Sequence, residues 1–382
     1  MKTKYLRYGG FLMGVLLLTF FHTYAQENLP NKEVKLHKNT PEILEEVVIE
    51  KGTISILSEN PPPIKKLIIK GTLIIADDKE ILLQVAQLEI DGGTLQVGTN
   101  EKEHLNTFAI LLNSEDPSVT AVIKIKNKGS ILLHGSSENM PLNIHAKPWE
   151  NPNDGQLQRN ITIATYSGES SGFMVIEDAT QVKISGVQFK GLGLRDSIPA
   201  LSWHGQTASP GQINNSVFVD SHYTDLYMDK TSAAIENNIF ISKNGNSILC
   251  SPSGIGIENN IEANIIFNHS DSDVFAVATK NPYQSITNNY ITVKGNTHGI
   301  GMLLRPEHEN FAWKTSYVSF VMEGNHIEKI IPTAPKMDSV LETKGILIDN
   351  FNHTGIWRTK NNTVSYFDKG IIIKSKNVVV EK

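Results

Sequence analysis

The chain has 382 residues, of which 40% are hydrophobic and 20% charged, and its formal net charge is −5 at pH 7. This composition suits a folded protein with a large core, and the lack of a basic excess argues against binding to nucleic acid or to an anionic membrane surface. The single cysteine, Cys250, cannot form a disulfide within the chain. We therefore expect a buried free thiol and a fold held by its core.

The first 25 residues have the pattern of a secretory signal peptide. A basic region (residues 2–7) precedes an apolar region (residues 11–21), and Ala25 ends a small-x-small cleavage site. The apolar region is about half as long as the roughly 20 residues that a membrane-spanning helix needs. We therefore expect cleavage near Ala25, a secreted, periplasmic or extracellular location, and no stable membrane anchor. Residues 26–44 are polar and contain two prolines, which is typical of a linker.

Residues 45–135 are a series of short apolar runs separated by glycines. Within the runs, apolar and polar residues alternate, as in Leu88-Glu89-Ile90-Asp91, which predicts strands with one buried face. Glycine permits positive φ where such a strand must turn sharply. The glycines in question are Gly52, Gly71, Gly92, Gly93, Gly98, Gly129 and Gly135.

From Ile161 onward a unit recurs in which an apolar residue and one further residue precede Asn-Asn. The second asparagines of the copies are Asn215, Asn238, Asn260, Asn289, Asn325 and Asn362. They are 23, 22, 29, 36 and 37 residues apart. A period of 22 to 23 residues, lengthened by insertions, is typical of a coil of a parallel β-helix. Asparagine tolerates the left-handed conformation at a corner, and stacked asparagine amides can form a hydrogen-bonded ladder.

These patterns predict an all-β protein in which a β module leads into a right-handed parallel β-helix. The predicted segments are a signal peptide (1–25), a linker (26–44), the β module (45–135), a connecting loop (136–160) and the β-helix (161–382). The last apolar run of the chain has no recognisable cap, although solenoids normally need one. We therefore expect either a capping loop or a further domain or partner at this open end.

The stretch from residue 45 to residue 135 resembles the G8 domain, which is named for its eight glycines. The resemblance rests on VVIEKGTISIL from Val47, the proline-rich turn before LIIKGTLII, IDGGTLQVGT from Ile90, and the closing ILLHG. In that family the domain precedes a right-handed β-helix of the pectin-lyase type. The arrangement occurs in cell-surface hyaluronidases of the cell-migration-inducing type and in fibrocystin-like proteins. The resemblance thus implies binding of a glycosaminoglycan-like polysaccharide.

One histidine of the hyaluronidase-like members has a counterpart in this chain. Those members carry Tyr-Pro-Ile-His-x-His, and the corresponding run here is Ile198–His204, with Ser202 at the first histidine position and His204 at the second. Residues 226–229 stand where those members have Ile-His-Gly, and residues 249–252 where they have Leu-Glu-Asp-Gly. The resemblance therefore implies a role for His204 and departs from the family at the other positions.

Stacked coils present side chains along one face at a spacing of roughly 4.8 Å, which suits an extended polysaccharide. His204, His222 and Asp225 follow such a face and are the catalytic candidates, as a base and a carboxylate for cleavage of a glycosidic bond or for lyase chemistry. The alternative interpretations are a packed turn residue for His204 and an acidic solvated turn for the other two.

Other polar and aromatic residues are candidates for binding. The candidates for contact with the sugar are Trp203, His298, Arg305 and His308. Asp271 and Asp273 are candidates for binding calcium through oxygen ligands, the one cofactor considered.

Three functions are compatible with these features. The first is recognition of an extracellular polysaccharide, and the second is activity as a glycoside hydrolase or polysaccharide lyase of the hyaluronidase-like group. The third is a structural or adhesion role at the cell surface without carbohydrate chemistry.

Overall fold

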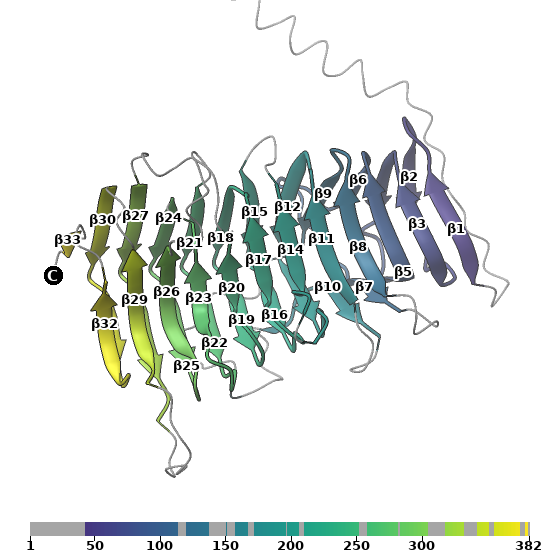
Figure 1. The fold of residues 1–382 in the computed structure, drawn as a ribbon. Coiled ribbons are helices and arrows are strands. Elements are labelled where there is room, and N and C mark those ends of the chain that lie inside the picture. The colour runs from purple at the N-terminus through teal and green to yellow at the C-terminus, as the bar shows by residue number, and fades with distance from the viewer. Residues whose placement is uncertain are drawn as a thin grey trace, which may run out of the picture.

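The computed structural model describes residues 43–113, 120–136, 150, 157–166, 172–195, 197–205, 210–251, 258–281, 283–304, 318–331, 342–350, 355–374 and 379–380. The described part of the chain forms 33 strands (Figure 1). None of its segments is a helix of the length and apolar character that crossing a membrane requires. The predicted signal peptide, Arg305 and His308 lie outside the described residues.

The strands pair in parallel and form three ladders that run along one axis (Figure 1). Ladder A consists of β2 (Ile54–Leu57), β4 (Thr72–Ile75), β6 (Thr94–Val97), β9 (Ser130–His134), β12 (Gln181–Ser185), β15 (Gly211–Asn214), β18 (Ala233–Glu236), β21 (Asn259–Glu262), β24 (Gln284–Thr287), β27 (Val318–Glu323), β30 (Gly355–Lys360) and β33 (Val379–Val380).

Ladder B consists of β1 (Leu44–Ile49), β3 (Ile64–Ile69), β5 (Ile81–Asp91), β8 (Ala121–Lys126), β11 (Gly172–Glu177), β14 (Leu201–His204), β17 (Leu226–Asp229), β20 (Ile248–Cys250), β23 (Phe275–Thr279), β26 (His298–Leu304), β29 (Lys344–Asn350) and β32 (Lys369–Ile373). Ladder C consists of β7 (Phe108–Leu112), β10 (Ile161–Thr165), β13 (Val187–Lys190), β16 (Val217–Val219), β19 (Ile239–Ser242), β22 (Ile265–Asn268), β25 (Tyr290–Val293), β28 (His326–Lys329) and β31 (Thr363–Ser365). The first half of β5 also pairs with β7, and its second half with β8.

From β7 onward each coil contributes one strand to each ladder, whereas the coils before it contribute strands to ladders A and B only, so the chain forms a parallel β-helix and the predicted fold class is confirmed. The pairing does not break between the β module and the later coils, because β7, β8 and β9 pair with β10, β11 and β12. The glycine-cornered module therefore forms the first coils of the same solenoid.

The core lies between the three ladders and is filled by the side chains that alternate inward along each strand. On β14, Leu201 and Trp203 point inward and are fully buried. On ladder C, the rings of Phe189, Phe218 and Phe240 stack on one another at centroid distances of 4.5 and 4.8 Å. Identical positions in successive coils thus stack like on like, which is the packing that a regular period imposes.

The predicted asparagine ladder is present at the corner between ladders A and C. Its members are Asn238, Asn264, Asn289, Asn325 and Asn362, and each of the first four donates an amide N–H to the Oδ1 of the next, at 2.9 to 3.1 Å. Each also donates to a backbone carbonyl of the preceding coil at 2.8 or 2.9 Å. The prediction of a ladder is therefore confirmed.

Two of the predicted members, Asn215 and Asn260, do not belong to the ladder. The position of the residue that forms each corner explains the difference. The residue before each ladder position has positive φ, for example 49° at Asn215 and 54° at Ala263. Asn215 therefore makes the corner itself, and Ser216 occupies the ladder position, where its N–H donates to Asn238 Oδ1 at 2.9 Å. Asn260 lies four residues before the true member of its coil and points outward from β21.

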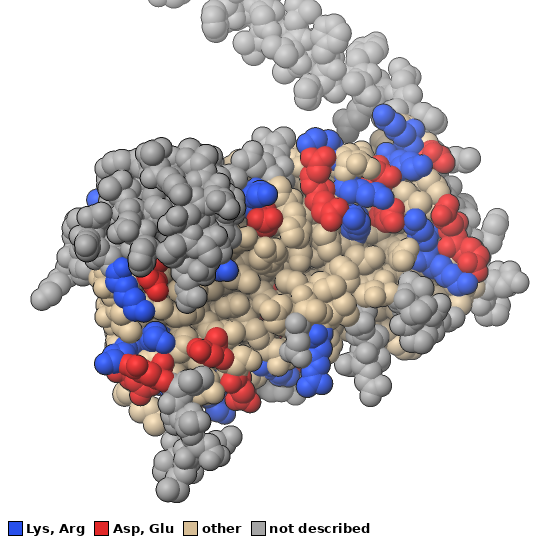
Figure 2. All heavy atoms as spheres, in the orientation of Figure 1, with Lys and Arg blue, Asp and Glu red and all other residues tan. Residues whose placement is uncertain are grey.

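The outer faces of the ladders differ in what they can offer to a ligand. On ladder C, outward residues of the central coils are apolar and buried, and Leu157 packs against them. This cluster comprises Leu157, Val217, Ile239, Ile241, Ile265 and Phe267. On the first coils of ladder B, charges alternate in sign (Figure 2), and Glu89 lies 3.3 Å from Lys66 and 2.9 Å from Lys126. Neither surface is suited to a polar, extended ligand. The ladder C surface is apolar and covered by Leu157, and the charged side chains on the first coils of ladder B pair with one another.

Replacing Gly211 by alanine should destabilise the solenoid. A Cβ at this position on β15 would lie 2.0 Å from Cη2 and 2.3 Å from Cζ2 of the buried Trp203. Overpacking of this kind lowers the free energy of unfolding by about 1–3 kcal/mol. Urea unfolding followed by tryptophan fluorescence measures this loss. Gly370→Ala is the matched control, because a Cβ there would have no neighbour within 4 Å; equal effects of the two substitutions would contradict the expectation.

Candidate functional site

His204 is the last residue of β14 and points outward from ladder B. Successive side chains of a strand point to opposite faces, and Trp203 points into the core, so His204 must face outward. Its side chain is 39% exposed, and its Nδ1 lies 3.6 Å from Oδ2 of Asp229, its register partner on β17. The ring of Tyr227 lies 5.6 Å from the His204 ring in an edge-on arrangement. An imidazole thus lies beside a carboxylate and an aromatic ring that both come from β17.

A second carboxylate lies on the other side of His204. Glu177 on β11 is the register partner of His204 and is 2.9 Å from Lys124. We call the four outward residues Glu177, His204, Tyr227 and Asp229 the ladder B polar row. An imidazole beside a carboxylate can act as a base or as a hydrogen-bonding partner of hydroxyl groups.

The sequence pattern contained a signal for two members of this row that were not among the predicted site residues. In Leu226-Tyr227-Met228-Asp229, the apolar Leu226 and Met228 are buried in the core, so the residues between and after them must face outward. The same alternation places Trp203 inside. The prediction that Trp203 contacts a sugar was therefore wrong, and Tyr227 is the aromatic residue of this surface.

The prediction that Asp225 is catalytic was also wrong, because its carboxyl group lies inside the solenoid. It is fully buried, and its Oδ2 accepts a hydrogen bond from Ser242 Oγ. Ser242 in turn contacts Ser247 Oγ at 2.5 Å, and Asn268 Nδ2 donates to Ser247 Oγ at 3.2 Å. Burial raises the pKa of Asp225 to about 7, against which the serine hydrogen bonds act only in part. The group belongs to an internal polar network.

His222 does not join His204. It lies in the turn before β17, and its backbone N–H donates to the carbonyl of Leu192 at 2.8 Å. Asp229, the register partner of His204, is at the opposite end of β17. The structure therefore separates the three predicted catalytic residues into an outward row, a turn and the interior.

His298 and Asp273 are brought together, but as a structural pair. His298 Nε2 lies 2.6 Å from Asp273 Oδ1, its Nδ1 accepts from the Lys344 N–H at 3.2 Å, and the Phe275 ring packs against it. The His298 side chain is only 3% exposed, and this burial lowers its pKa. The prediction that His298 contacts a ligand was therefore wrong, because its ring is enclosed.

In the part of the chain that the structure describes, no third His, Cys, Asp or Glu side chain joins Asp271 and Asp273 at the predicted calcium site. Asp273 already uses Oδ1 to bind His298. Among the described residues, no group of three or more His, Cys, Asp or Glu side chains is arranged to hold a metal ion. The described side chains thus do not fit the oxygen-rich shell that calcium requires.

The fold defines a class of protein: an all-β chain in which a glycine-cornered module forms the first coils of a parallel β-helix. Residues 34–143 match the model of the G8 domain family. The chain is 35% identical to fibrocystin-L of Homo sapiens over 104 residues and 35% identical to fibrocystin-L of Mus musculus over 94 residues. The predicted resemblance to the G8 domain is confirmed over residues 34–143, and the resemblance to fibrocystin-like proteins extends over about a quarter of this chain.

These similarities cover a limited part of each protein. The matches to fibrocystin-L comprise 26% and 23% of this chain, and the chain spans only 2% of the length of either relative. Among solved structures, a mutant of the periplasmic alginate epimerase AlgG matches with a TM-score of 0.24 and 8% identity, over 86% of this chain and 77% of that one. A likeness this distant has no bearing on function.

Proposed function

We propose that this protein is secreted and recognises an extracellular, glycosaminoglycan-like polysaccharide through the ladder B polar row. The observation that carries the proposal is the placement of His204, outward and partly exposed, between the carboxylates of Glu177 and Asp229 and beside the Tyr227 ring. Imidazole and carboxylate groups hydrogen-bond to sugar hydroxyls, and an aromatic ring provides an apolar surface for the sugar face.

The geometry of the row favours a polymer over a small molecule. Its members come from three neighbouring strands, β11, β14 and β17, and the row therefore runs along the solenoid axis at steps of roughly 4.8 Å. An extended chain can contact several such steps at once. Weak contacts at each step then add up to useful affinity, as in other multivalent binding.

Cleavage of the polysaccharide is the second candidate function, and the His204–Asp229 pair favours it. A histidine close to a carboxylate, here at 3.6 Å, is a candidate general base. Glu177 and Asp229 are the register partners of His204 on the two neighbouring strands, so a carboxylate flanks the histidine on each side along the solenoid axis.

Binding is tested with the purified protein in affinity gels that contain hyaluronan, chondroitin, alginate or pectin. We expect at least one polymer to retard the protein, and His204→Ala to weaken that binding about tenfold, as expected for the loss of one or two hydrogen bonds. His326→Ala is the matched control, because His326 is a similarly exposed histidine beside a carboxylate, Glu328, on ladder C. Equal retardation of the two variants would place the binding surface elsewhere, and no retardation at all would favour a structural role.

Cleavage is tested on the same polymers by chain length and by the absorbance of unsaturated products. Depolymerisation that His204→Ala abolishes would support the second candidate function. Depolymerisation that persists in His204→Ala would place any catalytic centre outside the ladder B polar row. Retardation without depolymerisation leaves binding as the function.

A further inference from the structure

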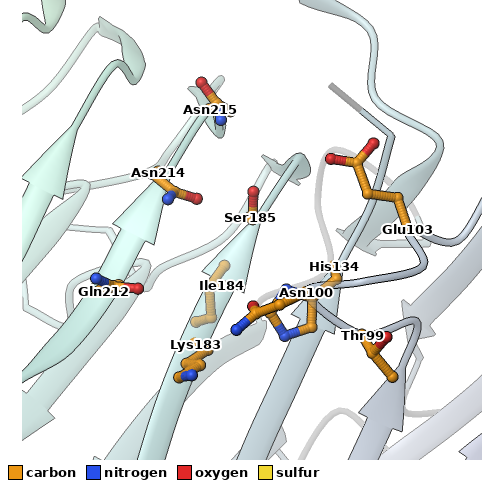
Figure 3. Close-up of a pocket in the computed structure, with 10 residues that line it drawn as sticks. All are labelled: Thr99, Asn100, Glu103, His134, Lys183, Ile184, Ser185, Gln212, Asn214 and Asn215. Carbon is orange, nitrogen blue, oxygen red and sulfur yellow. The ribbon is translucent and has the colours of Figure 1, made fainter. Parts of the chain in front are cut away.

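A polar pocket of about 230 Å³ opens on the outer face of ladder A, on a different face of the solenoid from the ladder B polar row (Figure 3). One wall is the segment of residues 98–106 that follows β6, and the floor is formed by β9, β12 and β15. The side chains that the argument below uses are Glu103, His134, Lys183, Gln212 and Asn214.

The wall of this pocket is held in place before any ligand arrives. His104, which is fully buried, donates its backbone N–H to the carbonyl of His134 at 2.7 Å. Asp77 Oδ1 accepts the backbone N–H groups of Leu105 and Asn106 at 2.9 and 2.8 Å. Gly98 has φ of +67°, and a Cβ there would lie 2.6 Å from the carbonyl oxygen of His134. A ligand therefore need not order this segment on binding, which saves conformational entropy.

The floor contains a polar atom that lacks a partner. Asn214 is an outward residue of β15, and its Oδ1 is buried without a hydrogen bond in the described structure. A buried acceptor without a donor is unfavourable, so such atoms usually mark a place that water or a ligand fills. In Figure 3, Asn214 and Gln212 lie on the strand side of the pocket and Glu103 on the loop side.

The charges of the pocket balance. Lys183 on β12 makes no hydrogen bond or ion pair with any other described residue, so its ammonium group is available as a donor. Glu103 supplies one negative charge on the opposite wall. His134 is buried, and both its burial and the positive charge of Lys183 lower its pKa, which favours the uncharged imidazole. A ligand with both donors and acceptors and no net charge suits this lining.

We propose that this pocket binds one neutral monosaccharide unit. Its volume is below the roughly 300–1,000 Å³ of pockets for drug-sized ligands, which limits the occupant to about one sugar ring. A sugar hydroxyl donates to Asn214 Oδ1, and the Lys183 ammonium group donates to a sugar oxygen. The predominance of amide, hydroxyl and charged side chains in the lining excludes an apolar ligand. The pocket acts independently of the ladder B polar row.

Saturation-transfer NMR and calorimetry on the full protein test this site with glucose, galactose, mannose and N-acetylglucosamine. We expect at least one of them to bind with a millimolar Kd. Asn214→Leu and Lys183→Met should each weaken that binding at least about tenfold. The matched controls are Thr287→Leu, on the same outward row of ladder A but outside the pocket, and Lys190→Met, an exposed lysine on ladder C. Both controls should leave the affinity unchanged.

His204→Ala separates this proposal from the proposed function, because it should impair polymer binding and leave monosaccharide binding intact. If Asn214→Leu prevents folding, the partly exposed Lys183→Met decides alone. The proposal is overturned if none of the four sugars binds, or if binding survives the pocket variants. It is also overturned if glucuronate or inorganic sulfate binds more tightly than every neutral sugar, since the pocket would then be an anion site.

Discussion

Asn264→Ala should lower the free energy of unfolding by about 3–5 kcal/mol, whereas Asn260→Ala, four residues away, should lower it by about 0.5 kcal/mol. Asn264 Oδ1 accepts the backbone N–H of Asn238 at 2.9 Å, and its Nδ2 donates to the carbonyl of Ile235 at 2.8 Å and to Asn289 Oδ1 at 2.9 Å. Truncation would leave those buried backbone groups of Asn238 and Ile235 without partners. Each such group costs about 1–3 kcal/mol.

Asn260 is the control because it shares the residue type and the coil but not the ladder. Its amide reaches only the outward carboxylates of Glu236 and Glu262, at 3.0 and 3.1 Å, where water can replace it. Urea unfolding monitored by circular dichroism measures both variants. Losses of equal size would show that the internal ladder adds nothing beyond an exposed hydrogen bond, and would contradict the expectation.

Asp225→Asn should stabilise the protein at alkaline pH and have little effect in acid. Burial raises the pKa of Asp225 to about 7 from its ordinary value of 3.8. Below pH 3.8 the carboxyl is protonated in both the folded and the unfolded protein. Between pH 3.8 and about 7 only the unfolded chain releases the proton, so the stability of the wild type falls as the pH rises through this window.

Above pH 7 the raised pKa of Asp225 lowers the free energy of unfolding by its full amount. This loss is at most about 4 kcal/mol, since each unit of pKa difference corresponds to about 1.4 kcal/mol. Asparagine cannot ionise, and its amide oxygen can still accept from Ser242 Oγ. Urea unfolding of wild type and Asp225→Asn at several pH values measures the difference. Asp178→Asn, at an exposed carboxylate that pairs with Lys128, controls for the loss of one negative charge. Parallel stability curves for wild type and Asp225→Asn would refute this account of the buried carboxyl group.

The candidate site was less accessible to sequence reasoning than the fold, for a reason that particular residues show. Trp203 and His204 are neighbours in the chain but face opposite sides of β14, so only one of them can meet a ligand. Asp225 looked like an exposed turn residue, yet it is buried against Ser242, which the next coil supplies. Adjacent positions in the chain thus have different surroundings because neighbouring coils, which are distant in sequence, form those surroundings.

Local pattern alone predicted that this chain is a β-helix, and the resemblance of residues 45–135 to the G8 domain identified its first coils. Alternation of period two fixes which residues enter the core, and Asn or Gly before most ladder positions permits the sharp corner, as at Asn237 and Gly324, with Ala263 as the exception. Both signals act over a few residues and can be read directly. The tertiary structure decided the ladder member Asn264, the outward row around His204 and the pocket at Asn214. Each of these depends on the register between coils, which insertions of different length set and which no short stretch of sequence contains.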